Sequence, residues 1–211
     1  GHLRLALAFP NGYFVGMSNL GCQTVYRLLN AREDVVCERV FLPPKQDLKA
    51  MGDRRLPLVT LESQTPVNDF DVFAFSVSFE WDYTNVLTML GLARLPVYAS
   101  DRTAKHPLIV IGGAVTFVNP EPLAPFAHVI AAGEGGVLVP AIADAFDRGT
   151  VERQDALRAL TGQRGFYIPS FYDVRYDEQG RIAAYEPKPG TGAPPVVRKA
   201  AVKTTEALDP P

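Results

Sequence analysis

Short apolar runs alternate with amphipathic segments along most of this chain. Five runs are continuous enough to be buried strands, and each is followed by glycine, proline or a polar turn. We expect strands at residues 3–9, 35–42, 71–78, 107–111 and 127–131. The third run is apolar at nearly every position, which is typical of a central strand in a parallel sheet.

Helical spacing of apolar residues fills most of the gaps between these strands. It predicts helices at residues 19–30, 46–51, 82–92 and 137–146, whereas residues 96–99 are either a short extra strand or a connection. Alternating strands and helices predict βαβ units with right-handed crossovers. We therefore expect an α/β fold, Rossmann-like or flavodoxin-like, with a parallel sheet of about five strands in the order 2-1-3-4-5 and flanking helices.

The pattern changes after residue 150, where one more helix is expected at 151–160. Residues 165–176 are aromatic with alternating character, a polar turn follows at 177–180, and residues 181–185 form the returning segment, which predicts a C-terminal β-hairpin. Many prolines follow without an apolar period, as in a linker or a surface arm. We expect an α/β domain at 3–150, a helix and hairpin appendage at 151–186, and a Pro-rich linker at 187–211 toward a further domain.

Composition narrows the classes of protein that this chain can be. It has 211 residues, of which 47% are hydrophobic, and can bury a substantial core. Its formal charge of −2 argues against a general nucleic-acid or membrane-surface binder, and no apolar run approaches the ~20 residues of a membrane helix. We expect no nucleic-acid partner, no membrane partner and a cytoplasmic location. Cys22 and Cys37 fit buried free thiols better than a disulfide framework.

Familiar catalytic and metal-binding patterns are missing from the sequence. It has no GxxxxGK[ST], GxGxxG, CxxC or CxxxCxxC, and therefore no common nucleotide-binding motif and no cysteine set for an iron–sulfur cluster. His106 and His128 fall at the amino-terminal ends of the fourth and fifth strands, and we interpret both as surface or edge residues. We expect no Ser-His-Asp triad, no catalytic residue and no metal ligand.

Two apolar strands that end in glycines form the most informative local pattern. Residues 109–113 read IVIGG and residues 129–136 read VIAAGEGG. Ligands of open α/β sheets bind beyond the carboxyl ends of the strands, where glycine lets the backbone approach a ligand closely. Turn glycines and helix caps would explain the same pattern without a ligand. The candidate cofactor-binding residues are Asn11, Gly12, Ser76, Ser78, Gly112, Gly113, Thr116, Gly133, Glu134 and Gly135.

Longer stretches resemble a known protein family. GGAVTFVNPEPL, followed by FAHVIAAGEGG, is similar to the glycine-rich signature of the cobalamin-binding-like domain found upstream of radical SAM domains. VGMSNLGCQTVYRLLNARED and DFDVFAFSVSFEWDYTNVLTML extend this resemblance, which covers nearly the whole chain. The chain thus resembles the N-terminal part of a radical SAM iron–sulfur protein.

The resemblance implies a Rossmann-like cobalamin-binding fold followed by a barrel-like catalytic domain with a CxxxCxxC site. Cobalamin could then bind in this domain, whereas the [4Fe–4S] cluster and S-adenosylmethionine would belong only to the downstream radical SAM domain, the expected partner. The parent protein would be the enzyme. Two departures from the family pattern matter: the DxHxxG motif that supplies a histidine to cobalt is absent, and Gly136 replaces the second glutamate of GEGE.

Three functions remain open for the loops at the carboxyl edge. The domain could be a degenerate cobalamin-binding-like module for docking or substrate presentation, which the missing histidine and the aromatic residues Tyr13, Phe14, Trp81 and Tyr83 favour. It could be a genuine cobalamin-binding domain that uses no axial histidine. It could also bind a nucleotide or a flavin, because a fold alone does not select a ligand.

Overall fold

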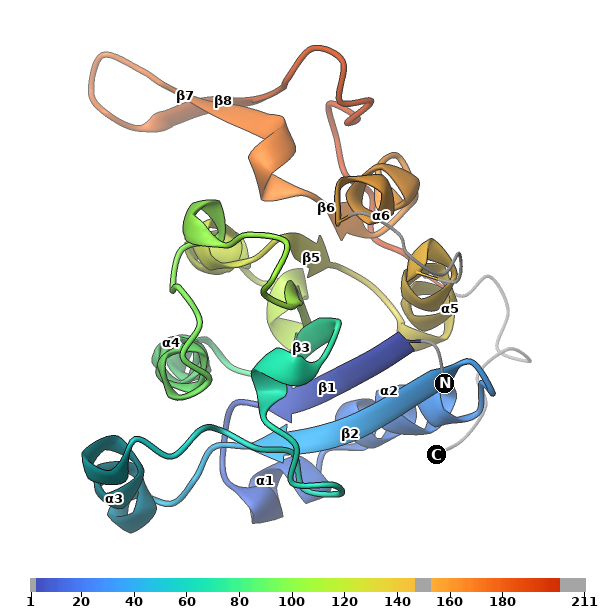
Figure 1. Cartoon of the computed structure of the whole chain (residues 1–211). Coiled ribbons are helices and arrows are strands. Elements are labelled where there is room, and N and C mark those ends of the chain that lie inside the picture. Colours follow the sequence, from blue (N-terminus) through green and yellow to red (C-terminus); the bar gives the residue numbers. More distant parts are fainter. Residues whose placement is uncertain (1–2, 147–152, 202–211) are drawn as a thin grey trace.

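The computed structural model describes residues 3–146 and 153–201 (Figure 1). A six-stranded sheet with the order β2-β1-β3-β4-β5-β6 forms its centre. Strands β1 to β5 are parallel, and β6 is antiparallel to β5. The strands span Leu3–Phe9 (β1), Val35–Phe41 (β2), Val72–Ser76 (β3), Leu108–Gly112 (β4), Val129–Ala131 (β5) and Phe166–Tyr167 (β6). The expected Rossmann-like α/β fold and the order 2-1-3-4-5 are confirmed.

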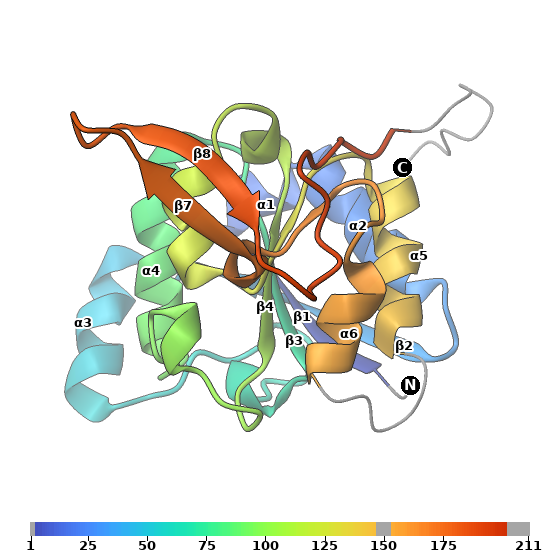
Figure 2. The same ribbon diagram turned by 90° about the horizontal axis from the view of Figure 1, so that it is seen from above.

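Helices cover both faces of this sheet. Figure 2 shows α2, α5 and α6 on one side and α3 and α4 on the other. The α-helices span Tyr13–Met17 (α1), Leu20–Asn30 (α2), Lys45–Arg54 (α3), Tyr83–Leu92 (α4), Gly135–Phe146 (α5) and Arg153–Leu160 (α6). Short 3-10 helices span Val67–Asp69 (η1), Glu80–Asp82 (η2), Ala99–Asp101 (η3), Ala114–Phe117 (η4), Glu121–Phe126 (η5) and Pro169–Phe171 (η6).

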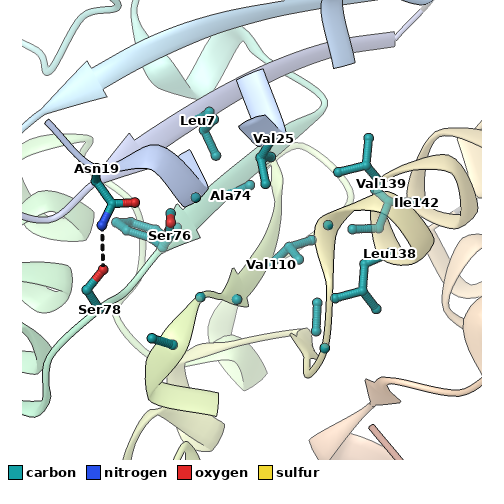
Figure 3. A pocket seen from close by; sticks show the side chains of 18 of the residues that line it. Leu7, Asn19, Val25, Ala74, Ser76, Ser78, Val110, Leu138, Val139 and Ile142 are labelled. Atoms are coloured by element: carbon teal, nitrogen blue, oxygen red, sulfur yellow. Dashed lines mark hydrogen bonds between the residues drawn. The ribbon is translucent and has the colours of Figure 1, made fainter. Parts of the chain in front are cut away.

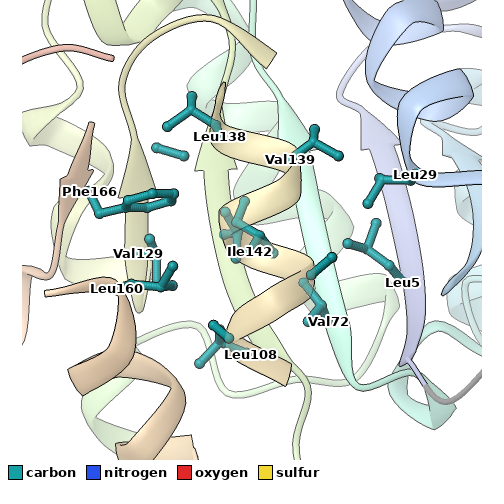
Figure 4. Close-up of a cluster of buried hydrophobic side chains, with 14 of the residues drawn as sticks. Leu5, Leu29, Val72, Leu108, Val129, Leu138, Val139, Ile142, Leu160 and Phe166 are labelled. Carbon is teal, nitrogen blue, oxygen red and sulfur yellow. The ribbon is translucent and has the colours of Figure 1, made fainter. Parts of the chain in front are cut away.

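The pleat of the strands divides the hydrophobic side chains between two cores. Leu5 and Leu7 of β1 join the cluster that contains the buried faces of α2, α5 and α6. Ala6 and Ala8 belong to the cluster on the opposite face, which includes the buried side of α4. Figure 4 shows Ile142 of α5 among the side chains of the first cluster. Because both faces are covered, the central strands read as continuous apolar runs.

The aromatic segment after α6 is built differently from the expected single hairpin strand. Phe166 and Tyr167 instead form β6 and pair with β5 in the main sheet. The chain then passes through η6 into a separate hairpin of β7 (Tyr172–Tyr176) and β8 (Ile182–Pro187). A two-residue strand is too short to show alternation, so the sequence pattern could not separate it from β7. Residues 96–99 form a connection rather than a strand.

The C-terminal segment 188–201, which we call the arm, ends against the carboxyl edge of the sheet. The N–H of Gly165 donates to the carbonyl of Arg198 at 2.7 Å, and the N–H of Ala200 donates to the carbonyl of Ala132 at 3.0 Å. The carbonyl of Ala200 accepts from the N–H of Glu134 at 3.1 Å. The end of the arm is therefore an integral part of the fold. The expected domain boundary at 150, the expected helix start at 151 and residues 202–211 lie outside the described residues.

His128 is buried, and its interpretation as a surface or edge residue is wrong. Its Nδ1 accepts a hydrogen bond from the N–H of Ile109 at 2.8 Å, while Nε2 has no partner among the described residues. Burial lowers the pKa of His128 to about 3, and the nearby guanidinium groups of Arg153 and Arg102 add to this effect. The strand pattern placed His128 correctly, immediately before β5, but could not show that Arg153 of α6 and Arg102 of the connection before β4 lie near it.

Both cysteines are buried and free, as expected. Burial is the main reason that the pKa of Cys22 is raised to about 11, so its thiol stays protonated at neutral pH. Across residues 3–146 and 153–201, no helix has the length and apolar character needed to cross a bilayer.

Candidate functional site

A cavity of about 400 Å³ opens where β1, β3, β4 and β5 end (Figure 3). This volume falls in the range of ~300–1,000 Å³ that is typical of ligand pockets. Its inner wall is apolar and combines side chains of the sheet with side chains of α2 and α5. The apolar wall consists of Leu7, Val25, Ala74, Val110, Leu138, Val139 and Ile142.

Hydrogen-bonding side chains lie only at the mouth of this cavity. The Nδ2 of Asn19 donates to the hydroxyl of Ser78 at 3.1 Å, as Figure 3 shows. The Oδ1 of Asn19 accepts from the N–H of Cys22 at 2.8 Å and so caps α2, which fixes the orientation of its amide. Ser76 lies beside this pair, and none of the described residues that line the cavity is charged. The arrangement suits a neutral apolar group inside and a polar group at the mouth.

The glycines at the mouth are required by close packing between loops. Gly113 has a φ of +97°, and a Cβ built on it would lie 2.5 Å from the carbonyl oxygen of Val77. The N–H of Val77 donates to the carbonyl of Gly112 at 2.9 Å, so the loops after β3 and β4 are joined by backbone contacts. Gly112 and Gly113 therefore allow the loops after β3 and β4 to pack together at the cavity mouth, whether or not a ligand binds.

The ten residues predicted to bind a cofactor fall into two groups. Those that line the cavity are Ser76, Ser78, Gly112, Gly113, Gly133 and Gly135. The other four are engaged elsewhere. Asn11 donates from Nδ2 to Oδ1 of Asp82 at 3.1 Å, and its own Oδ1 accepts from the N–H of Gly12. The hydroxyl of Thr116 donates to the carbonyl of Gly113, and the backbone of Glu134 binds the arm.

Sequence reasoning missed the contribution of the helices to this cavity. Val25 of α2 and Leu138, Val139 and Ile142 of α5 line it. Their apolar spacing indicated that these helices face the sheet, but the same spacing would occur if the space between them were filled. Asn19 carried a usable signal, since a polar residue that caps a helix at the carboxyl edge is well placed to meet a ligand.

Exposed apolar side chains lie on several loops at the carboxyl edge of the sheet. They follow β1, β3 and β4 or begin α2, and Phe14 and Trp81 are 84% and 78% exposed. We call these residues the apolar rim: Tyr13, Phe14, Val15, Leu20, Phe79, Trp81, Phe117 and Val118. Tyr83, also predicted at this edge, is half-buried, and its hydroxyl donates to the carbonyl of Asn119. Extended exposed apolar patches on soluble domains usually mark interaction sites.

The residues at this edge fit some of the groups implied by the sequence resemblance better than others. Among the described residues, no three His, Cys, Asp or Glu side chains converge to hold a metal ion. No histidine lines the cavity, so cobalt would receive no imidazole from its walls. The apolar walls and hydroxyl-bearing mouth do fit a neutral apolar group. The whole sequence lacks the CxxxCxxC that would bind a [4Fe–4S] cluster.

The fold and the cavity define a doubly wound α/β domain with a ligand-type crevice at the carboxyl ends of its strands. The family described as "Radical SAM proteins, N-terminal" matches residues 21–169, which is more than half of the chain, and the chain belongs to this family. The family implies a radical SAM domain further along the same polypeptide. Neither the comparison with curated proteins nor that with solved structures found a match.

Proposed function

We propose that this domain is an accessory module whose apolar rim docks the radical SAM domain of the same protein, so that the two domains enclose a shared site. In this role it is a degenerate cobalamin-binding-like module that serves for docking or substrate presentation. The observation that carries the proposal is the apolar rim itself, which places Phe14 and Trp81 almost fully in solvent.

The composition of the rim supports a protein partner. Aromatic side chains dominate the energetics of interfaces, and a buried tryptophan or tyrosine is often worth ~2 kcal/mol or more on truncation. The rings of Phe79 and Trp81 lie 5.8 Å apart, and those of Tyr13 and Phe14 lie 5.6 Å apart. These pairs present preformed apolar surfaces, so their burial would cost little side-chain ordering.

The course of the chain supports the same partner. Ala200 is only 2% exposed and lies beside Gly133 at the carboxyl edge. The arm therefore lies along the edge that carries the rim, and a partner docked on the rim would also lie next to the arm.

Association of separately produced domains tests this proposal. The chain would be titrated into the radical SAM domain of the same protein by calorimetry, as wild type and as Trp81→Ser and Phe14→Ser. We expect each rim substitution to raise the dissociation constant at least about tenfold, which corresponds to ~1.4 kcal/mol.

Tyr176→Ser is the matched control, because Tyr176 is an exposed aromatic residue of the hairpin, 61% accessible, that is not part of the rim. It should leave the dissociation constant within about twofold of wild type. Equal effects of the rim and hairpin substitutions would refute docking through the rim.

The cavity favours a second candidate function, cobalamin binding without an axial histidine. Residues of the apolar wall would surround the neutral planar base of the cofactor, and Asn19, Ser76 and Ser78 would hydrogen-bond near the mouth. Bound cobalamin would supply organometallic chemistry next to the catalytic domain. Titration with hydroxocobalamin, followed by visible spectroscopy, should give a saturable change that Ala74→Leu abolishes by filling the cavity. A spectrum that does not change with protein would exclude the cofactor and leave the docking proposal intact.

A further inference from the structure

A second cavity, of about 280 Å³, lies beneath the hairpin and the arm. Tyr167 of β6, Tyr172 of β7 and Tyr185 of β8 contribute to its walls, and we call it the tyrosine cage. The rings of Tyr167 and Tyr172 meet edge to face, with centroids 5.3 Å apart. No residue lines both the tyrosine cage and the 400 Å³ cavity, so the two are separate sites.

The tyrosine cage contains one carboxylate, that of Glu121. The hydroxyl of Tyr167 lies 3.5 Å from Oε1 of Glu121. Burial raises the pKa of Glu121, and hydrogen bonds from Tyr167 and Tyr185 act in the opposite direction. Two neutral hydroxyls therefore approach a partly desolvated acid, and the ion pairs among residues 3–146 and 153–201 include none with Glu121.

Lys199 lines the same cavity but directs its charge elsewhere. Its ammonium lies 4.3 Å from the centroid of the Phe117 ring and donates to the carbonyl of Phe117 at 3.4 Å. Within residues 3–146 and 153–201, the ion pairs given by the structure include none between Lys199 and Glu121. A ligand can therefore supply the cation that Glu121 lacks.

Aromatic rings around a carboxylate select for organic cations. The negative faces of tyrosine rings attract an ammonium group within ~6 Å, and this attraction grows when water is excluded. An ionised carboxylate in a partly desolvated site is stabilised by an opposite charge and disfavours anions. A neutral ligand of the same shape would gain only the apolar contacts.

We propose that the tyrosine cage binds a small organic cation, namely an alkylammonium or quaternary ammonium group. Glu121 balances its charge, and the three tyrosines enclose its methyl or methylene groups. Pro195 and Val197 of the arm form part of the wall, and the hydroxyl of Tyr172 donates to the carbonyl of Pro194 at 2.7 Å. Occupancy of the tyrosine cage therefore also stabilises the arm against the domain.

Choline and its neutral isostere dimethylbutanol, in which carbon replaces the charged nitrogen, are the probes that test this proposal. Each would be titrated into the whole chain while tyrosine resonances are followed by NMR. We expect choline to bind at least about tenfold more tightly than dimethylbutanol. Choline affinity should also rise as the pH increases through the titration of Glu121, because only the ionised carboxylate attracts the cation.

Glu121→Gln keeps the size of the side chain and removes its charge, so it should weaken choline binding about tenfold while affecting dimethylbutanol little. Glu186→Gln is the matched control, since Glu186 lies next to Tyr185 on β8 but pairs with Arg175 at 3.1 Å on the exposed face. Equal affinity for both probes, or no saturable shift with choline in a folded protein, would overturn the proposal. Neither result depends on docking through the apolar rim.

Discussion

Gly133 lies directly against Ala200: a Cβ atom built on Gly133 would be only 2.2 Å from the carbonyl oxygen of Ala200. Gly133 also has a φ of +146°, a conformation that other residues rarely adopt. Gly133, which follows β5, therefore contacts the arm and also lines the cavity. This contact joins residues 67 positions apart in the sequence and holds the end of the arm at the carboxyl edge of the sheet.

Gly133→Ala should displace the arm. The clash and the backbone strain are expected to cost ~2–4 kcal/mol in the free energy of unfolding, and trypsin should cleave faster after Arg198 and Lys199. Gly12→Ala is the control, because its added Cβ would have no atom within 4 Å and its φ is −62°. Urea denaturation and limited proteolysis measure both effects. If Gly133→Ala behaved like Gly12→Ala, the arm would not depend on this contact.

Ala74 and Ala6 should respond differently to enlargement. Ala74 lines the 400 Å³ cavity, and Ala74→Leu has space into which the larger side chain can extend, so we expect a change below ~1 kcal/mol in unfolding free energy. Ala6 is fully buried in the opposite core, where Ala6→Leu should cost ~1–3 kcal/mol or more. Chemical denaturation compares the two variants. Similar losses at both positions would show that the cavity is filled by protein in solution.

Asp82 should make the protein less stable as the pH rises. Asp82 is 1% exposed as a residue, Asn11 and Asn85 donate only to Oδ1, and Oδ2 has no partner among the described residues. Burial raises the pKa of Asp82, so its favourable contribution is complete below the ordinary carboxyl pKa and is lost as the pH rises through the folded pKa.

Asp82→Asn keeps the acceptor and removes the charge. The stability of this variant relative to wild type should therefore improve as the pH increases, because only the wild-type side chain must ionise in a buried position. Thermal denaturation from pH 4 to pH 8 measures the difference, and Glu80→Gln, at an exposed neighbouring position, serves as the control. Parallel pH profiles of stability for wild type and Asp82→Asn would contradict a raised pKa of Asp82 in the folded protein.

His128 should make the protein less stable as the pH falls, which is the opposite of the effect expected from Asp82. The pKa of His128 is lowered from 6.5 to about 3, chiefly by burial, so the stabilisation is complete above about pH 6.5 and is lost as the pH falls toward 3. In His128→Asn, the Oδ1 can still accept from the N–H of Ile109 but cannot be protonated. The variant should lose stability at neutral pH through poorer packing yet show a flatter acid limb in denaturation experiments. An unchanged acid limb would show that groups other than His128 cause the loss of stability at low pH.

The parts of the fold that could be predicted are those whose burial gives a recognisable pattern of apolar residues in the sequence. Strands β1, β3 and β4 are covered on both faces, so their sequences are almost entirely apolar, and the alternation of strands and helices indicated parallel βαβ units. The two residues of β6 show no period, and the arm docks through the backbone of Arg198 and Ala200, which no side-chain pattern reports. These long-range contacts depend on the assembled sheet.

The candidate site was predictable in position but not in shape. The polar mouth could be placed because Ser76 and Gly112 end adjacent strands, and parallel strands share one carboxyl edge. The depth of the cavity could not be predicted, because Val139 and Ile142 would have the same spacing in the sequence if the core between the helix and the sheet were filled. The tyrosine cage combines side chains from η5, β6 and the hairpin, and their proximity follows only from where the hairpin packs.

Amide hydrogen exchange in the full-length protein tests the docking of the apolar rim most directly. If the radical SAM domain covers the rim, amides at residues 13–20 and 79–82 should exchange at least about tenfold more slowly in the full-length protein than in this chain alone. The exposed hairpin β7–β8 should exchange equally in both. Equal exchange of the rim loops with and without the radical SAM domain would show that the rim is not a docking surface.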